Sequence, residues 1–339
     1  MKTSLVRPYL VSIALLAGAV MLSIAIGSVF VPPSELFRIL FGVGSSNGDA
    51  AVFRSIVVDL RLPRMVMLVM VGAALASSGG AYQGLFRNPL ADPYLIGVAS
   101  GAGLGAVIAM TIQPATTSLG LFIVPMAAFL AALATVVIVY ALARVGKTVP
   151  VTNLILAGVA ASSFATALTS FVMINSTGEL RRAVVWMLGG STLAGWPPVL
   201  AAFPYIAAGL AILLFMGHPL NVLQFGEEQA AQLGLRVGTA RVWIVFAATL
   251  ATAAAVAFAG IIAFVGLIVP HLIRLAWTSD HRHLLPLSMI CGAAMLLGAD
   301  AIARTILSPQ VLPVGIVTAL IGAPFFFWVL RSAKQQNYW

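Results

Sequence analysis

The stretch that decides the fold is residues 61–105, which read RLPRMVMLVMVGAALASSGGAYQGLFRNPLADPYLIGVASGAGLG. It opens with an apolar run long enough to cross a membrane, and the run ends at the turn-forming sequence that begins at Arg87. Small residues that are four apart lie on one helix face and let a second backbone approach closely. The stretch therefore predicts a helix packed inside a bundle rather than a lipid-facing anchor. The small residues are Gly72, Ala76, Gly80 and Gly84.

The composition of the whole chain agrees with a membrane protein. Of its 339 residues 61% are hydrophobic and only 8% are charged, whereas a soluble domain has about 25% charged residues. We therefore expect one integral membrane domain covering residues 1–339. The net charge of +9 is the kind that meets anionic headgroups at the ends of spans, so we expect no nucleic-acid partner.

Apolar segments of about 20 residues are candidate membrane-spanning helices. The segment 262–275 is too short to cross alone and contains Pro270 and His271, so we expect a short tenth helix that protein shields from lipid. The prediction is an all-α polytopic fold with about ten transmembrane helices. The nine longer candidates are 9–30, 63–86, 94–112, 120–143, 151–174, 197–216, 240–261, 284–307 and 313–331.

The basic residues predict the orientation. Ten spans put both termini on one side, and more of the 18 lysines and arginines fall on that side than on the other. Because cytoplasmic loops carry the excess of basic residues, both termini are expected in the cytoplasm of a multi-pass protein of the bacterial inner membrane.

Three arginines oppose this bias, because Arg61, Arg64 and Arg304 lie at the outer ends of predicted spans. They could dock an acidic partner through paired hydrogen bonds to carboxylates. They could instead pair locally, Arg61 with Asp59 and Arg304 with Asp300. Spacing alone favours local pairing, although Arg64 has no equally close acid.

The loop at 217–238 is too polar to span the membrane and too apolar to be a free loop. Its apolar spacing predicts a short amphipathic helix with Glu227 and Glu228 near its start, followed by a turn at Gly234. Helices that lie on lipid are usually rich in lysine and arginine, and this one is acidic. A protein partner on the cytoplasmic side is therefore the favoured interpretation.

The chain lacks the motifs of enzymes and metal sites. Gly146-Lys147-Thr148 ends like a phosphate-binding loop, but that motif needs glycine at position 141, where Ala141 stands. We expect no catalytic residue, no metal site and no cofactor in this chain. Because few charges lie within the predicted spans, a stand-alone secondary transporter is the less favoured alternative.

Several motifs together resemble the FecCD-type permeases, the membrane subunits of ABC importers for iron-siderophores, haem and vitamin B12. The resemblance covers nearly the whole chain. The matching segments are 60–64, 72–76, Gln83, 88–93, 95–98, 226–230, 264–271 with Arg274, 299–300 with Arg304, 312–318 and 322–326.

The resemblance implies a ten-helix, vitamin B12 permease-like subunit that pairs with a second permease subunit. A periplasmic or lipoprotein solute-binding protein would dock at Arg61, Arg64 and Arg304. Two ABC ATPase subunits, which bind ATP and Mg, would dock at the coupling segment. A metal chelate, by default a ferric siderophore and otherwise haem or cobalamin, would pass between the permeases. The implied coupling residues are Gly226, Glu227, Glu228, Ala230, Leu233, Gly234 and Leu235.

Members of this family also carry an inverted internal repeat, and the chain shows a faint echo of it. Arg64 leads through small residues to Asn88 and Pro89, and Arg241 leads through small residues to Pro270 and His271. The first copy would start outside and the second inside, as inversion requires. We expect these helix breaks to belong to the packing or the transport pathway.

Overall fold

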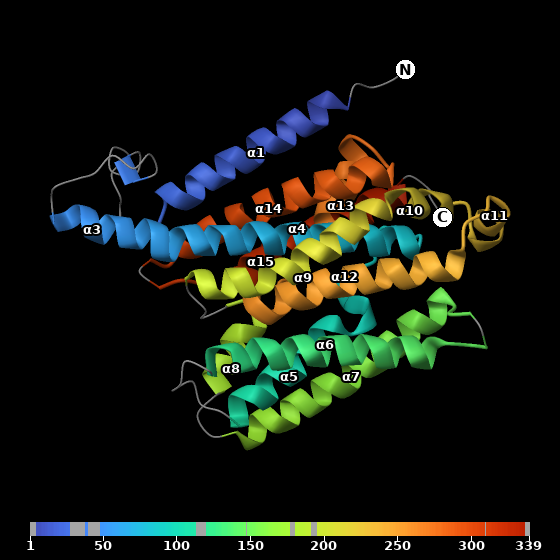
Figure 1. Ribbon diagram of the computed structural model, residues 1–339, viewed down its shortest axis with the longest axis horizontal. Coiled ribbons are helices and arrows are strands. Elements are labelled where there is room, and N and C mark those ends of the chain that lie inside the picture. The colour runs from blue at the N-terminus through green and yellow to red at the C-terminus, as the bar shows by residue number, and fades with distance from the viewer. Residues whose placement is uncertain are drawn as a thin grey trace.

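A computed structural model describes residues 5–27, 38–39, 48–112, 120–146, 148–176, 180–190, 195–308 and 310–335. This part of the chain is helical apart from its connections and one isolated bridge between Val145 and Thr148. The helices run along the length of an elongated bundle (Figure 1). Residues 28–30 of the first predicted span lie outside the described residues.

Each of the ten predicted spans corresponds to a helix, which confirms the all-α polytopic fold. Six of the described helices are long and apolar enough to cross a membrane, and α5, α13 and α15 are shorter apolar helices. The ten helices are α1 (Val6–Ala25), α4 (Leu62–Leu85), α5 (Val98–Ile112), α6 (Gly120–Ala143), α7 (Val151–Asn175), α9 (Trp196–Phe215), α12 (Val237–Ala259), α13 (Val265–Ala276), α14 (His281–Thr305) and α15 (Val314–Gln335).

Shorter elements lie between these spans, and most of them were not predicted. They include α3 (Gly48–Ser55), the π-helix η1 (Ile56–Arg61), the 3-10 helix η2 (Pro93–Ile96) and α8 (Leu180–Met187). The loop at 217–238 was predicted to hold one short helix, and it holds two: α10 (Gly217–Leu223) and α11 (Glu227–Gln232). The span predicted at 94–112 is divided by Gly97, which adopts a left-handed conformation between η2 and α5.

The centre of the bundle consists of α4 and α12, which lie side by side and antiparallel (Figure 1). Every residue of α4 from Val71 to Leu85 is buried, and so is every residue of α12 from Ala251 to Ala259. Both segments consist mainly of alanine, glycine and serine or threonine. Because small side chains allow close backbone approach on all sides, these two helices can be surrounded by others.

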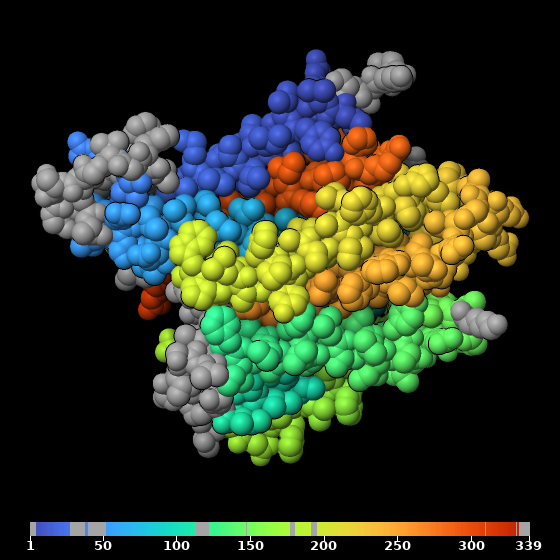
Figure 2. Space-filling model, in the orientation of Figure 1, coloured from blue at the N-terminus to red at the C-terminus, as the bar shows by residue number. Residues whose placement is uncertain are grey.

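The remaining helices surround this pair and expose apolar surface. α1 packs along α14 at one edge, and α5, α6 and α7 pack together at the opposite edge (Figure 2). The buried residues of α7 are Leu154, Gly158, Ala165 and Thr169, which share one helix face. Its exposed residues include Phe164, Phe171 and Ile174. An apolar outer surface of this kind is the one that lipid or another membrane subunit covers.

η1 joins α3 to α4 in one continuous helix, and its wider, π-helical turn lies just before Pro63. Proline has no backbone N–H and disrupts ordinary i→i−4 bonding. The helix widens at this point, and the N–H of Leu62 bonds to the carbonyl of Val57, five residues back. The continuous rod places Arg61 and Arg64 on adjacent turns.

The chain breaks again inside the bundle between α12 and α13, where residues 260–264 are not helical. Backbone groups at membrane depth need partners within the protein. Tyr94 provides them, because its hydroxyl donates to the Ile262 carbonyl at 2.8 Å and accepts from the Ile262 N–H at 3.3 Å. The predicted short tenth helix is therefore present as α13, and η2 shields its start.

The two ends of the bundle differ in structure. One end, here called the α11 end, holds α10, α11 and the start of α14, and α1 begins there because Tyr9 contacts His283 at 3.3 Å. α15 starts at the other end, here called the α3 end, and runs toward the α11 end (Figure 1). The first and last helices therefore meet the same end of the molecule, as an even number of spans requires.

Candidate functional site

At the α3 end a single buried carboxylate lies between two arginines. Asp300 is fully buried and accepts hydrogen bonds from Nε and Nη2 of Arg64 at 3.0 and 2.7 Å. Its other oxygen lies 2.8 Å from Nε of Arg304, one helix turn along α14. The side chain of Arg64 is 42% exposed, whereas that of Arg304 is 9% exposed. Of the two guanidinium groups, only that of Arg64 reaches the surface.

Arg61 and Arg304 hold the C-terminal end of α1. Arg61 donates to the carbonyls of Ile24 and Ala25 at 2.6 and 3.3 Å. Arg304 donates to the carbonyls of Ile26 and Ser23 at 2.8 and 3.1 Å. The last carbonyls of a helix lack partners within the helix and carry partial negative charge, so cations stabilise them. These two buried arginines therefore join α1 to α4 and α14.

Of the two local pairings considered from the sequence, the structure contains the one between Arg304 and Asp300, whereas Arg61 and Asp59 have other partners. Arg304 does pair with Asp300 on the same helix. The guanidinium of Arg61 points to the end of α1, while the carboxylate of Asp59 accepts a hydrogen bond from Ser55 at 2.9 Å. Arg64, which has no equally close acid in the sequence, pairs with Asp300 of α14.

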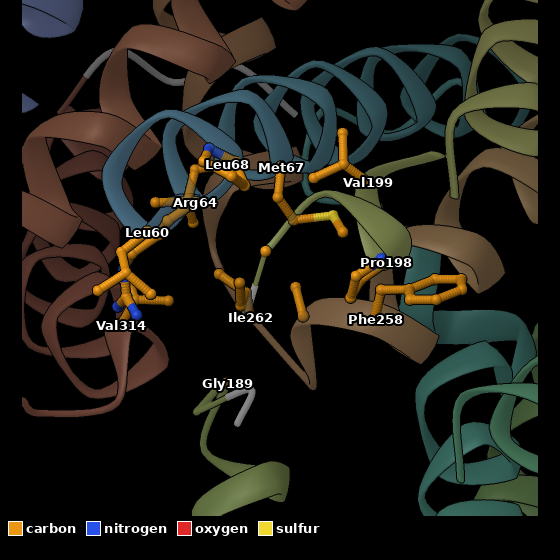
Figure 3. A pocket seen from close by; sticks show the side chains of 13 residues that line it. Leu60, Arg64, Met67, Leu68, Gly189, Pro198, Val199, Phe258, Ile262 and Val314 are labelled. Atoms are coloured by element: carbon orange, nitrogen blue, oxygen red, sulfur yellow. The ribbon is translucent and has the colours of Figure 1, made fainter. Parts of the chain in front are cut away.

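Arg64 also lines a cavity at the α3 end, between α4, α9, the end of α12 and the start of α15 (Figure 3). The cavity has a volume of about 190 Å³, and Arg64 is the one charged residue among the described residues that line it. A second cavity of about 210 Å³ shares Arg64, Gly189 and Val314. The rest of the first lining consists of Leu60, Pro63, Met67, Leu68, Gly189, Gly195, Pro198, Val199, Phe258, Ala259, Ile262 and Val314.

The stripe of small residues on α4 lies against α14 for most of its length. A Cβ added at Gly72 would lie closer than 3.0 Å to backbone atoms of Gly292, which also faces Ala76. One added at Gly80 would meet Leu284 of α14. These positions allow the close approach of the two backbones.

Gly84 and its neighbours complete the α11 end of α4. A Cβ added at Gly84 would meet the His281 ring at the start of α14. Asn88 and Pro89 follow in an exposed turn, in which the Asn88 side chain accepts a hydrogen bond from the N–H of Leu90 at 2.9 Å. The described contacts of this pair are therefore those of a turn.

A second close contact, which the sequence reasoning did not identify, lies on another face of α4. A Cβ added at Gly79 would lie closer than 3.0 Å to the carbonyl oxygen of Gly266 in α13. That carbonyl lacks its usual partner because Pro270, four residues on, has no N–H. Nε2 of Gln83 donates to it at 3.3 Å and to the carbonyl of Leu267 at 3.2 Å.

Arg274 completes this arrangement by donating to Oε1 of Gln83. With its oxygen accepting from Arg274 and its nitrogen donating to α13, the Gln83 amide has a defined orientation. The next residue after the proline, His271, stacks edge-on against Phe325 of α15 at a ring distance of 6.3 Å. Pro270 and His271 thus take part in the contacts of α13, Pro270 with α4 and His271 with α15.

α11 is a short helix with well-defined ends. Gly226 precedes it with φ +98° and Gly234 follows it with φ +87°, a conformation that favours glycine. The N–H groups of Gly234 and Leu235 bond to the carbonyls of Ala231 and Ala230 at 3.0 Å each. This is the Schellman pattern of a helix C-terminus, so the predicted turn at Gly234 has a specific structural basis.

The outer surface of α11 is acidic and partly apolar. Glu227 and Glu228 lie in its first turn and are exposed, and Ala230 is its one buried residue. Phe225 and Leu233 flank the helix and are also exposed. Acidic side chains beside exposed apolar ones are suited to a protein partner.

Side chains from α10 connect this segment to the rest of the bundle. Asn221 accepts from the N–H and Nδ1 of His281 at 2.8 and 2.9 Å and donates to Asp280 at 2.6 Å. Because a backbone N–H can only donate, the Asn221 oxygen must face His281, and Nδ1 of that ring therefore carries its proton. Gln224 donates to the carbonyl of Gly84 at 2.9 Å.

The carboxylate of Asp280 begins α14. It accepts a hydrogen bond from the N–H of Arg282 at 3.0 Å and forms an ion pair with the Arg282 side chain at 2.6 Å. The Arg282 side chain, together with Asn221, holds the pKa of Asp280 well below its usual range. Among the described residues no group of three or more His, Cys, Asp and Glu could hold a metal ion.

Sequence reasoning missed most of these polar contacts. Gln83 was noticed as a motif position without a role, Arg241 as the start of the second repeat copy, and Asn221 not at all. The available signal was the polar side chain itself, because an amide or guanidinium in an apolar helix needs a partner. The sequence does not show which partner it has.

The comparisons with known proteins match nearly the whole chain. Residues 15–332 match the FecCD transport family. The chain is 47% identical over 302 residues to a cobalamin import system permease protein, BtuC, of Halobacterium salinarum, covering 89% of this chain and 80% of the relative. It is 38% identical over 318 residues to a hemin transport system permease protein, HmuU, of Yersinia pestis, covering 93% of each.

A solved structure agrees with these sequence matches. It is described as an inward-facing conformation of a putative metal-chelate type ABC transporter. Its chain superposes with a TM-score of 0.82 at 31% identity, covering 97% of this chain and 99% of that one.

The fold and the relatives define a multi-pass membrane permease of the ABC transporter class. Within that class, the chain belongs to the FecCD transport family.

Proposed function

We propose that this chain is the permease subunit of an ABC importer that moves a metal chelate across the cytoplasmic membrane. ATP hydrolysis in a separate pair of subunits, which bind ATP and Mg, drives the movement. A second permease subunit, identical or related, completes the pathway between them. The observation that carries the proposal is α11, a short capped helix that has exposed acidic residues and is flanked by exposed apolar ones.

In this proposal the α11 end is cytoplasmic and both termini lie on that side. The ATPase subunits dock on the coupling segment from Gly226 to Leu235, with Phe225 and Leu233 as exposed apolar contacts. The α3 end then faces outward and meets the solute-binding protein.

The structure supports different roles for the three arginines proposed to dock the binding protein. Arg64 offers an exposed guanidinium that can form paired hydrogen bonds with a carboxylate of the partner. Arg61 and Arg304 are buried and support the docking surface by fixing the end of α1. Alternating access follows if the loaded binding protein has a higher affinity for the outward-facing state.

Affinity purification from native membranes tests the assembly. Recovery of an ABC ATPase and a solute-binding protein with this chain supports the importer, and a second, different permease would show a heterodimer. Uptake into proteoliposomes that contain the purified complex would then compare a ferric siderophore, haem and cobalamin. Uptake without ATP by the chain alone would favour the alternative, a stand-alone secondary transporter, and contradict the proposal.

Charge reversal tests the docking surface. Arg64→Glu should weaken binding of the solute-binding protein to the complex in nanodiscs by at least tenfold, because a like charge then faces the partner's carboxylate. Arg54→Glu is the matched control, since Arg54 is an exposed arginine of α3 at the same end. Equal affinity of the Arg64 variant and the control would remove Arg64 from the docking surface.

A further inference from the structure

α11 is held to the bundle by little apolar packing. Ala230 is its one buried residue. A cavity of about 230 Å³ lies beside it, between the end of α4, the start of α7, α10 and the start of α12. Because the segment is not close-packed on this side, its polar contacts carry much of the connection between α11 and the bundle.

The strongest of these contacts comes from Arg241 in the first turns of α12. Its side chain is 5% exposed and forms an ion pair with Glu227, the first residue of α11, which is 49% exposed. The same guanidinium donates to the carbonyl of Val149, two residues before α7 begins. One buried cation therefore connects α11, α12 and the start of α7.

The contacts at the α10 side of the segment lead to other helices. Asn221 connects to the start of α14, and Gln224 connects to the last turn of α4. If α11 moved, the contacts of Asn221 and Gln224 would transmit the movement to α14 and α4. The contacts of Arg241 would transmit it to α12 and the start of α7.

We propose that Arg241 is a positioning residue that transmits movement of α11 to α12 and α7 during transport. The proposal rests on the proposed function, because the ATPase subunits supply the movement. α12 forms the buried centre of the bundle, and it leads directly into the helix break at 260–264. A pull on its first turns is thus applied to a helix that packs against α4, α5, α6 and α9.

Charge exchange in the complete complex tests this role. Arg241→Glu and Glu227→Arg should each raise the amount of ATP hydrolysed per substrate transported at least fivefold, with the complex still assembled. The double exchange restores an opposite-charge pair and should recover at least half of the original coupling. Rescue by the double exchange would be specific to the pair. Both positions still carry a changed residue, so only the restored attraction between them can account for recovery.

Two further variants keep the test decisive. Arg236→Glu changes an exposed arginine immediately before α12 and should keep normal coupling. If Arg241→Glu fails to assemble, Glu227→Gln removes one charge at a half-exposed position and should still lower coupling.

Three outcomes would overturn the proposal. The first is normal coupling in both the Arg241→Glu and Glu227→Gln variants. The second is a double exchange that is no better than the single changes. In both cases the unmodified complex transports normally, so the proposed function stands. The third is an unmodified chain that takes up substrate without any ATPase subunit, which contradicts the proposed function as well.

Discussion

Arg64 and Asp300 are joined by two hydrogen bonds across 236 positions of sequence, and the contact locks the start of α4 to the end of α14. The carboxylate is fully buried and also faces Arg304. A buried, ionised carboxylate is tolerated here because each of its two oxygens faces an arginine. The same contact fixes the exposed guanidinium of Arg64 beside the cavity at the α3 end.

Removal of this carboxylate should be costly. Asp300→Ala leaves the buried Arg304 without its counter-charge, and breaking a buried ion pair in this way costs about 3–5 kcal/mol. Arg64→Met should cost less, about 1–3 kcal/mol, because the buried carboxylate loses the donors to one oxygen but keeps Arg304 as its counter-charge. Denaturant unfolding of the purified protein in detergent measures both, and a smaller loss for Asp300→Ala than for Arg64→Met would contradict this account.

The contact between α4 and α13 predicts a specific effect of a single methyl group. Gly79→Ala would place its Cβ against the Gly266 carbonyl, and overpacking of this kind costs about 1–3 kcal/mol or more. Gly298→Ala is the control, because a Cβ there meets nothing within 4 Å and alanine favours the helix by up to about 1 kcal/mol. Thermal unfolding should lower the melting temperature of the first variant only.

The role of Gln83 can be separated from general packing by a double-mutant cycle. Gln83→Leu should cost about 1–3 kcal/mol, because the carbonyl of Gly266 loses its donor. Pro270→Ala restores an N–H that can bond to that carbonyl within α13, so Gln83→Leu should cost less in this background. Strictly additive effects of the two changes would show that Gln83 does not replace the missing N–H.

The low pKa of Asp280 predicts how stability depends on pH. Its carboxylate is ionised in the folded protein below its ordinary pKa of 3.8, so it stabilises the fold above that pH. The advantage is lost as the pH falls below about 4 and through the lower folded pKa. Asp280→Asn keeps a helix-capping side chain without the charge. Its stability deficit should be constant near pH 6 and shrink below pH 4, and a deficit independent of pH would contradict the assignment.

The sequence predicted a helix at each of the ten proposed spans because each helix depends on local composition. A segment of about 20 apolar residues has few alternatives to a helix in a membrane, since its backbone groups must bond within the segment. The turn at Gly234 is local in the same sense, because its left-handed conformation follows from the residue itself. The stripe from Gly72 to Gly84 likewise marked a packing face, but it did not identify α14 as the neighbour.

What only the tertiary structure decided is which distant groups meet. Arg64 has no acid nearby in sequence, and its partner Asp300 comes from the end of the chain. Gln83 compensates for a proline that lies 187 positions later, and Arg241 reaches both α11 and Val149, two residues before α7. The physical reason is that buried polar groups require hydrogen-bond partners. The sequence shows which residues require a partner but not which residue supplies it. The packing of the helices decides which residue that is.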